Sequence, residues 1–179
     1  MQTQVESIRK PPDLSVGRFT NDKAHMTAIN RNHSSAPTTW LKEQGLLDAR
    51  IQKILDYGCG HGIDAYWLSR ATDGENVDKY DPYYFPLTKL VEASYDVIIC
   101  IYVLNVVFED EQEKIISRIT KLLKPGGKAY FAVRRDIKKE GFTTKKTFQR
   151  NVVLDLPVLC ENSSFCIYAL TSPISSTYP

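Results

Sequence analysis

Three glycines spaced two residues apart lie beside a carboxylate in residues 54–64, which read I-L-D-Y-G-C-G-H-G-I-D. A turn built from Gly58, Gly60 and Gly62 carries few side chains, so backbone N–H groups can approach a ligand between a strand and a helix. Asp56 precedes the first glycine by two residues, and its charge would repel a pyrophosphate but attract a cationic amino-acid or sulfonium ligand. The G-x-G-x-G spacing also differs from the G-x-G-x-x-G of dinucleotide-binding turns. The segment therefore predicts a site for a cationic small molecule.

The residues around this turn predict an alternation of strands and helices. The strongest strand is 95–104, because an almost unbroken run of apolar side chains suits a central parallel strand covered on both faces. The clearest helix is 109–123, with acidic residues at its start, lysines near its end and Pro125 shortly beyond it. We predict strands at 54–57, 77–81, 95–104, 129–133, 152–156 and 165–170, and helices at 63–70 and 109–123. This order predicts an α/β fold around a doubly wound, mostly parallel sheet.

The N-terminal quarter reads as an extension of this unit. Residues 1–20 predict a frayed tail, since two consecutive prolines forbid a helix and little apolar surface is offered. A polar stretch follows, and Thr38 or Thr39 then caps a short amphipathic helix that carries Trp40, Leu41, Leu46 and Leu47. We predict one domain, in which 1–48 are a tail and helical lid, 49–172 the α/β unit and 173–179 a disordered tail.

Composition and charge fit an ordinary globular protein. The chain has 179 residues, 42% of them apolar and 25% charged, and its net charge of +2 excludes a histone-like polycation. The four cysteines include no C-x-x-C pair, which predicts reduced thiols and a cytoplasmic location. The first residues lack the apolar core of a secretion signal, and the apolar run 97–107 is too short to cross a bilayer, so we expect no membrane partner.

Four motifs in order make residues 51–133 similar to the class I S-adenosylmethionine-dependent methyltransferases. The D-x-G-x-G-x-G of residues 56–62 resembles motif I of that family. Asp81 follows the aspartate of this motif by 25 residues and matches the acidic residue that binds the ribose hydroxyls. Residues 95–100 resemble the fourth strand of the family, and the L-K-P-G-G of residues 123–127 resembles the turn into its fifth strand. The resemblance implies a Rossmann-like methyltransferase fold with S-adenosylmethionine as the cofactor.

The same resemblance implies which residues bind the cofactor. Asp56 and the glycines would hold its methionine part, Asp81 its ribose, and residues 101–105 would form the floor beneath its methyl group. That Arg31 meets the cofactor carboxylate is a hypothesis. The expected contacts are Asp56, Gly58, Cys59, Gly60, Asp64, Asp81, Pro82, Ile101, Tyr102, Asn105 and Arg31. Methyl transfer mostly requires alignment of the two reactants, so we assign no catalytic base.

Three of these residues also have a plain structural interpretation. Asp64 either contacts the cofactor or stabilises the first turn of its helix, where a negative charge is favourable. Asn105 either positions the acceptor or the cofactor amino group, or it simply ends a strand. Tyr102 lies in an apolar run that is typical of a core.

The chain is shorter than the family pattern. Only 14 residues separate Asp81 from Asp96, too few for the usual helix and third strand, so we expect a shortened sheet with an N-terminal helical extension. Tyr83, Tyr84 or Phe85 would then replace the lost adenine contacts by stacking.

A basic segment bears on the acceptor. Residues 134–150 carry a net charge of +5 and two phenylalanines, a composition suited to phosphate contacts and base stacking, although a solvated loop is the alternative. We expect Arg134, Arg135 and Lys145 to reach the substrate, which weakly favours a nucleic acid such as DNA or RNA. The block 27–31, with Ser35 and Pro37, is also faintly similar to methyltransferases associated with DNA-modification gene clusters.

Motifs that the chain lacks narrow the chemistry. Asn105 is followed by Val106 and Val107, where amino-group DNA methylases place D/N-P-P-Y/F. No Pro-Cys nucleophile follows the same strand, and no His, Asp, Glu or Cys cluster has metal-ligand spacing, so we expect no metal. A small-molecule methyltransferase and a non-catalytic S-adenosylmethionine-binding module therefore stay open as alternatives.

Overall fold

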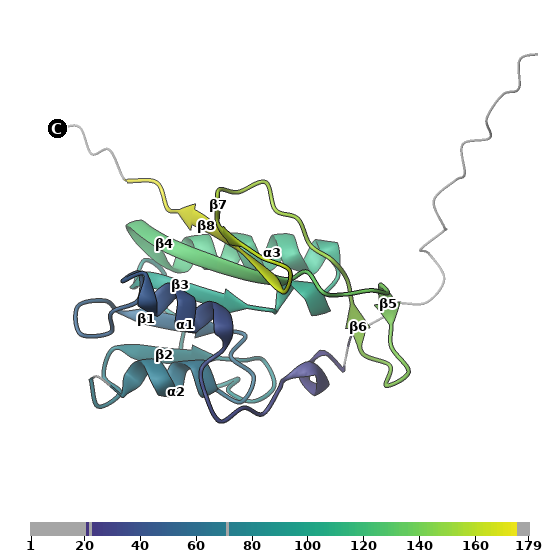
Figure 1. The fold of residues 1–179 in the computed structure, drawn as a ribbon. Helices are drawn as coiled ribbons and strands as arrows, with labels where there is room; N and C mark the ends of the chain where they lie inside the picture. The colour runs from purple at the N-terminus through teal and green to yellow at the C-terminus, as the bar shows by residue number, and fades with distance from the viewer. Residues whose placement is uncertain (1–20, 22, 71, 175–179) are drawn as a thin grey trace, which may run out of the picture.

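The main sheet has six strands in the order β2-β1-β3-β4-β8-β7 in this computed structural model, which describes residues 21, 23–70 and 72–174 (Figure 1). Its strands are β1 (Ile54–Tyr57), β2 (Val77–Tyr80), β3 (Tyr95–Ile101), β4 (Leu123–Arg134), β7 (Val158–Glu161) and β8 (Phe165–Thr171). The first four run parallel, whereas β8 is antiparallel to β4 and β7 is antiparallel to β8. The predicted mostly parallel α/β sheet is confirmed.

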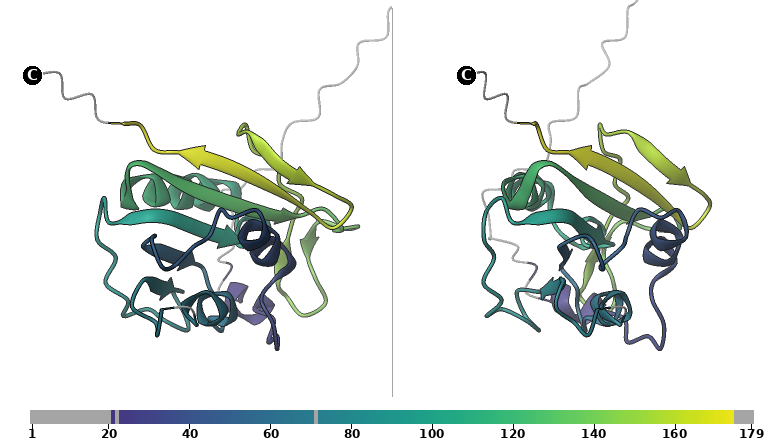
Figure 2. Two further views of the ribbon diagram at one scale, coloured as in Figure 1. Left: turned by 60° about the vertical axis from the view of Figure 1, so that its left-hand side comes forward. Right: turned by 90° about the vertical axis from the view of Figure 1, so that its left-hand side faces the viewer.

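Helices cover both faces of this sheet. Figures 1 and 2 show α1 (Ala36–Glu43) and α2 (Ile63–Ser69) on one face and α3 (Glu109–Leu122) on the other. Successive residues of β3 point to opposite faces, so Ile99 packs with Leu41 of α1, whereas Ile98 packs with Ile119 of α3. All four of these side chains are fully buried. The apolar run of β3 is therefore explained by burial on both faces.

Two connections are shorter than those of a full doubly wound fold. Residues 81–94 contain one isolated bridge, between Asp81 and Phe85, so β2 forms the edge of the sheet, as the short spacing predicts. Between β4 and β7 the chain forms a hairpin of two short strands, β5 (Gly141–Phe142) and β6 (Phe148–Gln149), instead of a helix. The hairpin projects beyond the end of β4 (Figure 1).

Several local predictions are wrong. Ser35 caps α1, since its Oγ accepts a hydrogen bond of 3.3 Å from the Thr38 N–H, and so Thr38 and Thr39 lie inside the helix. The strand predicted at 152–156 is absent: its alternate apolar residues pack on the core, but no strand pairs with them and the chain bends at 155–156. At the other boundaries, β3 ends at Ile101 and β4 already begins at Leu123.

The predicted N-terminal helical extension comprises the 3₁₀ helix η1 (Ala24–Thr27) and α1. The predicted tails at 1–20 and, in large part, 173–179 lie outside the described residues. All four cysteines are free, as the spacing predicts. No helix in the described part of the chain has the length and apolarity to cross a membrane.

Candidate functional site

A cavity of about 600 Å³ opens at the carboxyl ends of β1 to β4, the edge at which open parallel sheets bind ligands. Its volume is in the range of small-molecule sites. Every predicted cofactor contact lines it: Asp56, Gly58, Cys59, Gly60, Asp64, Asp81, Pro82, Ile101, Tyr102, Asn105 and Arg31. Of the predicted substrate contacts, Arg134 lines the cavity, whereas Arg135 and Lys145 do not. The fold thus brings together residues that lie far apart in the sequence.

Two glycines of the turn pack closely against neighbouring segments of the chain. Gly58 and Gly60 have φ angles of +74° and +53°, in the left-handed region that favours glycine. A Cβ on Gly58 would lie 2.4 Å from Val103 Cγ2, and a Cβ on Gly60 would lie 2.9 Å from the Ala28 Cβ. These two glycines therefore make room for Val103 and Ala28, which line the same cavity as the turn.

Asp56 is a buried carboxylate at the base of the turn. It is 2% exposed, and its Oδ2 accepts a hydrogen bond of 3.2 Å from the Ala65 N–H. Burial, followed by the negative charge of Asp64, raises its pKa well above the usual value. No ion pair involves Asp56 among residues 23–70 and 72–174. A cationic group in the cavity would therefore be stabilised by this carboxylate.

Asp81 holds the turn and the following segment together. Its Oδ2 accepts a hydrogen bond of 3.0 Å from the Gly60 N–H, and its Oδ1 accepts bonds from the N–H groups of Tyr83 and Tyr84 at 2.9 and 3.0 Å. The side chain is 8% exposed and borders the cavity. Asp81 thus shapes the rim of the site.

Three aromatic residues follow Asp81, and one of them reaches the cavity. Tyr83 lines it and stacks on His25, with ring centroids 3.8 Å apart. Tyr84 contacts the His61 ring and donates a hydrogen bond of 3.1 Å to the His25 carbonyl. The Phe85 ring lies against Lys79 Nζ at 4.2 Å. Of the three predicted stacking residues, Tyr83 alone is therefore placed to meet a ligand in the cavity.

Asp64 anchors the segment before α1. Its Oδ1 accepts hydrogen bonds from the Ser35 N–H at 2.5 Å and from Ser34 Oγ at 3.0 Å, and its Oδ2 forms an ion pair of 3.2 Å with Arg31. This role is additional to the two predicted for it. Arg31 keeps one donor unused, because its buried Nε has no hydrogen-bond partner. A buried donor without a partner is costly, so this wall of the cavity suits a ligand carboxylate.

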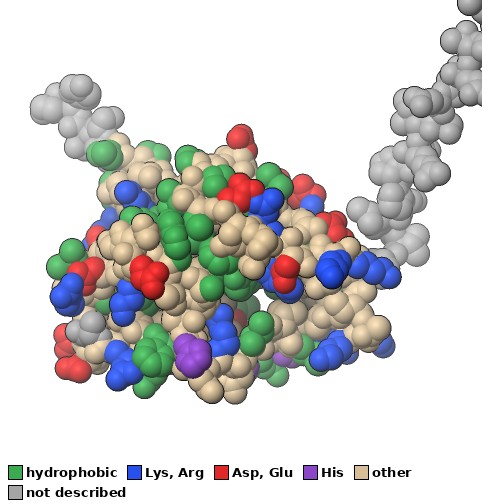
Figure 3. Space-filling view, in the orientation of Figure 1, with side chains coloured by type: hydrophobic (Ala, Val, Ile, Leu, Met, Phe, Trp, Pro, Cys, Tyr) green, Lys and Arg blue, Asp and Glu red, His purple; other side chains and the backbone are tan. Residues whose placement is uncertain are grey.

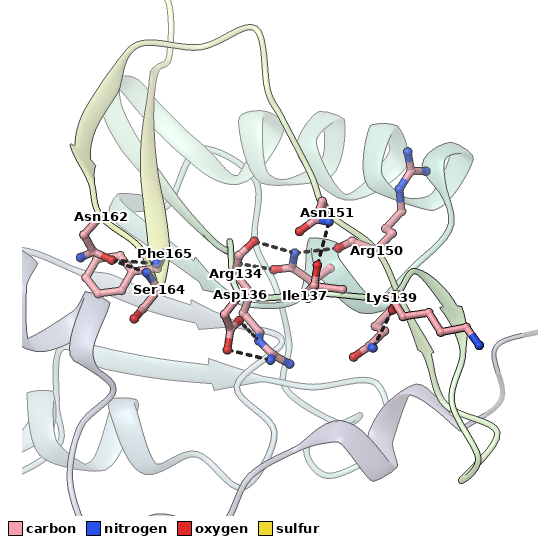
Figure 4. Close-up of polar contacts among 11 residues, drawn as sticks. Arg134, Asp136, Ile137, Lys139, Arg150, Asn151, Asn162, Ser164 and Phe165 are labelled. Atoms are coloured by element: carbon pink, nitrogen blue, oxygen red, sulfur yellow. Dashed lines mark hydrogen bonds and ion pairs between the residues drawn. The ribbon is translucent and has the colours of Figure 1, made fainter.

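Asn105 is fully buried and bonded to the chain backbone. Its Oδ1 accepts a hydrogen bond of 2.7 Å from the Arg134 N–H, and its Nδ2 donates to the carbonyls of Arg150 and Arg134 at 2.9 and 3.4 Å. Figure 4 shows this region, with Arg134 at the end of β4 and Arg150 after the hairpin. Because these bonds occupy its amide, Asn105 acts mainly by positioning the two ends of residues 134–150.

The basic segment packs by its aromatic residues. Phe142 and Phe148 contact each other and Phe108, with centroids 4.6 to 6.3 Å apart, so none of the three is an isolated stacking surface. Arg135 pairs with Glu161 of β7, outside the cavity. Lys145 is exposed, and Figure 3 shows a group of basic side chains over the part of the surface where Figure 1 places β5 and β6.

The end of the cavity nearest the hairpin, called the acceptor end below, includes residues that the sequence analysis did not name as ligand contacts, although it predicted that the 134–150 segment as a whole reaches the substrate. They come from α3 and from the segment after β4, and include Ile115, Ile137, Thr147, Phe148 and Gln149. No spacing pattern in the sequence connects α3 with the residues after β4, because the two segments meet only in the folded chain. A further missed residue is Tyr57 at the end of β1, where burial raises the pKa of its hydroxyl to about 12.

Comparison with known proteins identifies the family and the fold. Residues 25–161 match the family described as "Methyltransferase domain". The Burkholderia thailandensis 1,6-didemethyltoxoflavin-N1-methyltransferase is similar in structure, with a TM-score of 0.57, 15% identity and 77% of each chain covered. A structure described for the conversion of a disulfide bond into a thioacetal group during echinomycin biosynthesis has a TM-score of 0.56 and 12% identity, over 81% of this chain and 84% of that one.

A search of curated proteins finds no match. The family match covers most of the chain and includes the glycine turn, Asp81 and the end of β4. The two similar structures have the same overall fold as this chain. The chain therefore belongs to the methyltransferase-domain family and is an S-adenosylmethionine-dependent methyltransferase.

Proposed function

We propose that the protein methylates a small molecule that binds between the glycine turn and the β5–β6 hairpin. The observation that carries this proposal is the single cavity, which extends from Asp56 at the turn to Phe148 in the hairpin. S-adenosylmethionine supplies an electrophilic methyl group when bound. The chain would contribute binding, alignment of the two reactants and exclusion of water.

The residues at the glycine-turn end fit the cofactor. The buried Asp56 carboxylate would attract its positive charges, and the unpartnered Nε of Arg31 would donate to its carboxylate. Asp81 would accept from the ribose hydroxyls, and Tyr83 would stack on the adenine. These assignments follow the charges of the cavity wall, which carries three aspartates at this end.

The walls at the other end favour a small molecule over a nucleic acid. Ile115, Ile137 and Phe148 give this part of the cavity an apolar surface. The phenylalanines of the hairpin pack on Phe108, so they offer no free platform for bases. The similar Burkholderia protein is a methyltransferase with bound 1,6-didemethyltoxoflavin and S-adenosylhomocysteine, which supports an acceptor of this size.

A nucleic-acid acceptor is the second candidate. Lys138, Lys139, Lys145 and Lys146 are exposed, and none of them forms an ion pair within the described ranges of the chain. Exposed, unpaired lysines on one hairpin could contact phosphates, and such binding would weaken steeply with salt.

The experiment that separates these functions uses S-adenosylmethionine with a labelled methyl group, the full-length protein and a cell extract. Label in the small-molecule fraction supports the proposal, whereas label in DNA or RNA supports the second candidate. Calorimetric titration with S-adenosylhomocysteine is run in parallel. If the chain binds no S-adenosylhomocysteine and transfers no label, it is a non-catalytic member of its family.

A further inference from the structure

Arg134 is a cation that lines the acceptor end of the cavity, and the buried Asn105 side chain holds its backbone. It is the last residue of β4, and both its N–H and its carbonyl bond to the buried Asn105 amide, at 2.7 and 3.4 Å. Its side chain lines the cavity. The point from which the guanidinium projects is therefore fixed, and Figure 4 shows the side chain extending from the end of β4.

The partner of Arg134 is weakly held. Arg134 Nε donates to Asp136 Oδ1 at 2.8 Å, and its Nη2 donates to Asp136 Oδ2 at 3.1 Å. The two side chains are 40% and 54% exposed. Ion pairs as exposed as this one contribute only about 0–1 kcal/mol to the free energy of unfolding. Asp136 does not line the cavity. A carboxylate that entered from the cavity could take its place on the guanidinium fork at little cost.

The charge of the cavity changes sign along its length. The glycine-turn end carries Asp56 and Asp81, neither of which has an ion-pair partner in the described part of the chain. The acceptor end carries Arg134 beside the apolar Ile137 and Phe148. Glu111 and Lys114 also line the cavity and are opposite in sign, and Lys114 forms an ion pair of 3.1 Å with Asp110. The surroundings of Arg134 therefore suit a mainly apolar molecule with one compact anionic group.

We propose that the methyl acceptor carries a carboxylate or a similar compact oxyanion, which binds Arg134 by displacing Asp136. This inference rests on the proposed function, since it concerns the acceptor of that reaction. An uncharged acceptor gains nothing by separating Arg134 from Asp136, whereas an anionic one replaces both hydrogen bonds. The pair therefore acts as a specificity device, in which Asp136 holds the guanidinium in place and is displaced only by a ligand that is itself an anion.

The test compares 2-naphthoate with 2-naphthamide, two probes of nearly the same shape that differ in charge. Both are titrated calorimetrically into full-length protein saturated with S-adenosylhomocysteine. We expect naphthoate to bind about tenfold more tightly, which corresponds to a charge-assisted hydrogen-bonded pair at a partly exposed site. Arg134→Gln should abolish this preference. Asp136→Asn should instead tighten naphthoate binding about threefold or more, because the competing carboxylate is removed.

A matched control pair lies elsewhere in the chain. Arg50 donates from Nε and Nη2 to Asp48 at 2.8 and 2.7 Å, with the same two-residue spacing but outside the cavity. Arg50→Gln and Asp48→Asn should leave both affinities unchanged. Misfolding cannot explain opposite effects of Arg134→Gln and Asp136→Asn, so the pair of variants keeps the test decisive.

Three outcomes would overturn the inference. These are no naphthoate binding, equal binding of the two probes, and weaker naphthoate binding in Asp136→Asn. A single-stranded 20-nucleotide DNA that displaces naphthoate from the wild-type protein, and binds less tightly to Arg134→Gln, would assign the site to a nucleic acid instead. Failure of S-adenosylhomocysteine itself to bind would reject the proposed function, and this result is read before either probe is added.

Discussion

Asn105 and Arg150 exchange two hydrogen bonds. The Asn105 Nδ2 donates to the Arg150 carbonyl at 2.9 Å, and the Arg150 N–H donates to the Asn105 carbonyl at 2.8 Å. Asn105 also bonds to the backbone of Arg134, so this one residue joins the start and the end of the hairpin segment. The acceptor wall of the cavity is therefore tied directly to the segment that follows β3.

Removal of the Asn105 amide should loosen the hairpin segment. Asn105→Ala leaves the buried Arg134 N–H without its acceptor, so we expect a loss of about 2–3 kcal/mol in the free energy of unfolding. Hydrogen exchange should become faster across residues 134–150 and not elsewhere. Urea denaturation and hydrogen-exchange mass spectrometry measure both effects.

Asn162→Ala is the control, because Asn162 caps the exposed turn between β7 and β8. Unchanged exchange in residues 134–150 would disprove the positioning role of Asn105.

The cost of a side chain at Gly58 should exceed the cost at Gly45. The two glycines have nearly the same φ, +74° and +71°, but a Cβ on Gly45 meets nothing within 4 Å. Gly45→Ala should therefore cost only the strain of the left-handed backbone, about 1–2 kcal/mol. Gly58→Ala should cost about 1–3 kcal/mol more and weaken S-adenosylhomocysteine binding, because its Cβ collides with Val103.

The collision at Gly58 can be tested directly. Val103→Ala in the Gly58→Ala background should recover part of the lost stability, since it removes the methyl groups that clash but not the backbone strain. The same substitution in the Gly45→Ala background should recover nothing. Equal effects of Gly58→Ala and Gly45→Ala in urea denaturation would contradict the close approach of Val103.

Asp56→Asn should stabilise the protein and weaken cofactor binding. Burial raises the pKa of Asp56 in the folded state, so the folded chain binds more protons than the unfolded chain above pH ~4. The contribution of Asp56 to stability must therefore fall as the pH rises from that value through the raised pKa. Asp56→Asn should remove this decline, and urea denaturation between pH 4.5 and 8 measures the difference.

The same variant should discriminate between the two forms of the cofactor. S-adenosylmethionine carries one positive charge more than S-adenosylhomocysteine, so its affinity should fall more in Asp56→Asn. Calorimetric titration of both compounds provides the comparison. A variant that is less stable than the wild type at every pH would contradict the prediction, because it would show that the folded chain stabilises the Asp56 side chain.

Arg31→Ala should weaken S-adenosylhomocysteine binding about tenfold, because the unpartnered Nε donor is lost from the cavity wall. Ser34→Ala is the matched control, since it also removes one hydrogen bond to Asp64 but no positive charge. Ser34→Ala should bind S-adenosylhomocysteine with the affinity of the wild type. Should Arg31→Ala bind with unchanged affinity, the proposed contact between Arg31 and the cofactor carboxylate would be wrong.

Local patterns suffice to predict most of the sheet and the place of the site. The run of apolar residues in β3, the glycines after β1 and the short spacing from Asp81 to Asp96 are properties of neighbouring residues. Such patterns indicate the backbone conformation and which side chains are buried, and both depend on a few neighbouring residues. The alternation of apolar and polar residues at 152–156 led to a wrong strand prediction. It indicates which side chains are buried, but it does not indicate whether another strand lies alongside.

The partners of the polar side chains depend on the folded chain. Asp64 bonds to residues 29 to 33 positions away, and Asn105 to residues 29 and 45 positions away. A hydrogen bond requires its two atoms to lie about 3 Å apart, and a separation along the chain says nothing about that distance. Residue type and spacing therefore predict a cationic small-molecule site, whereas only the packing of distant segments separates ligand-facing groups from those that hold the site together.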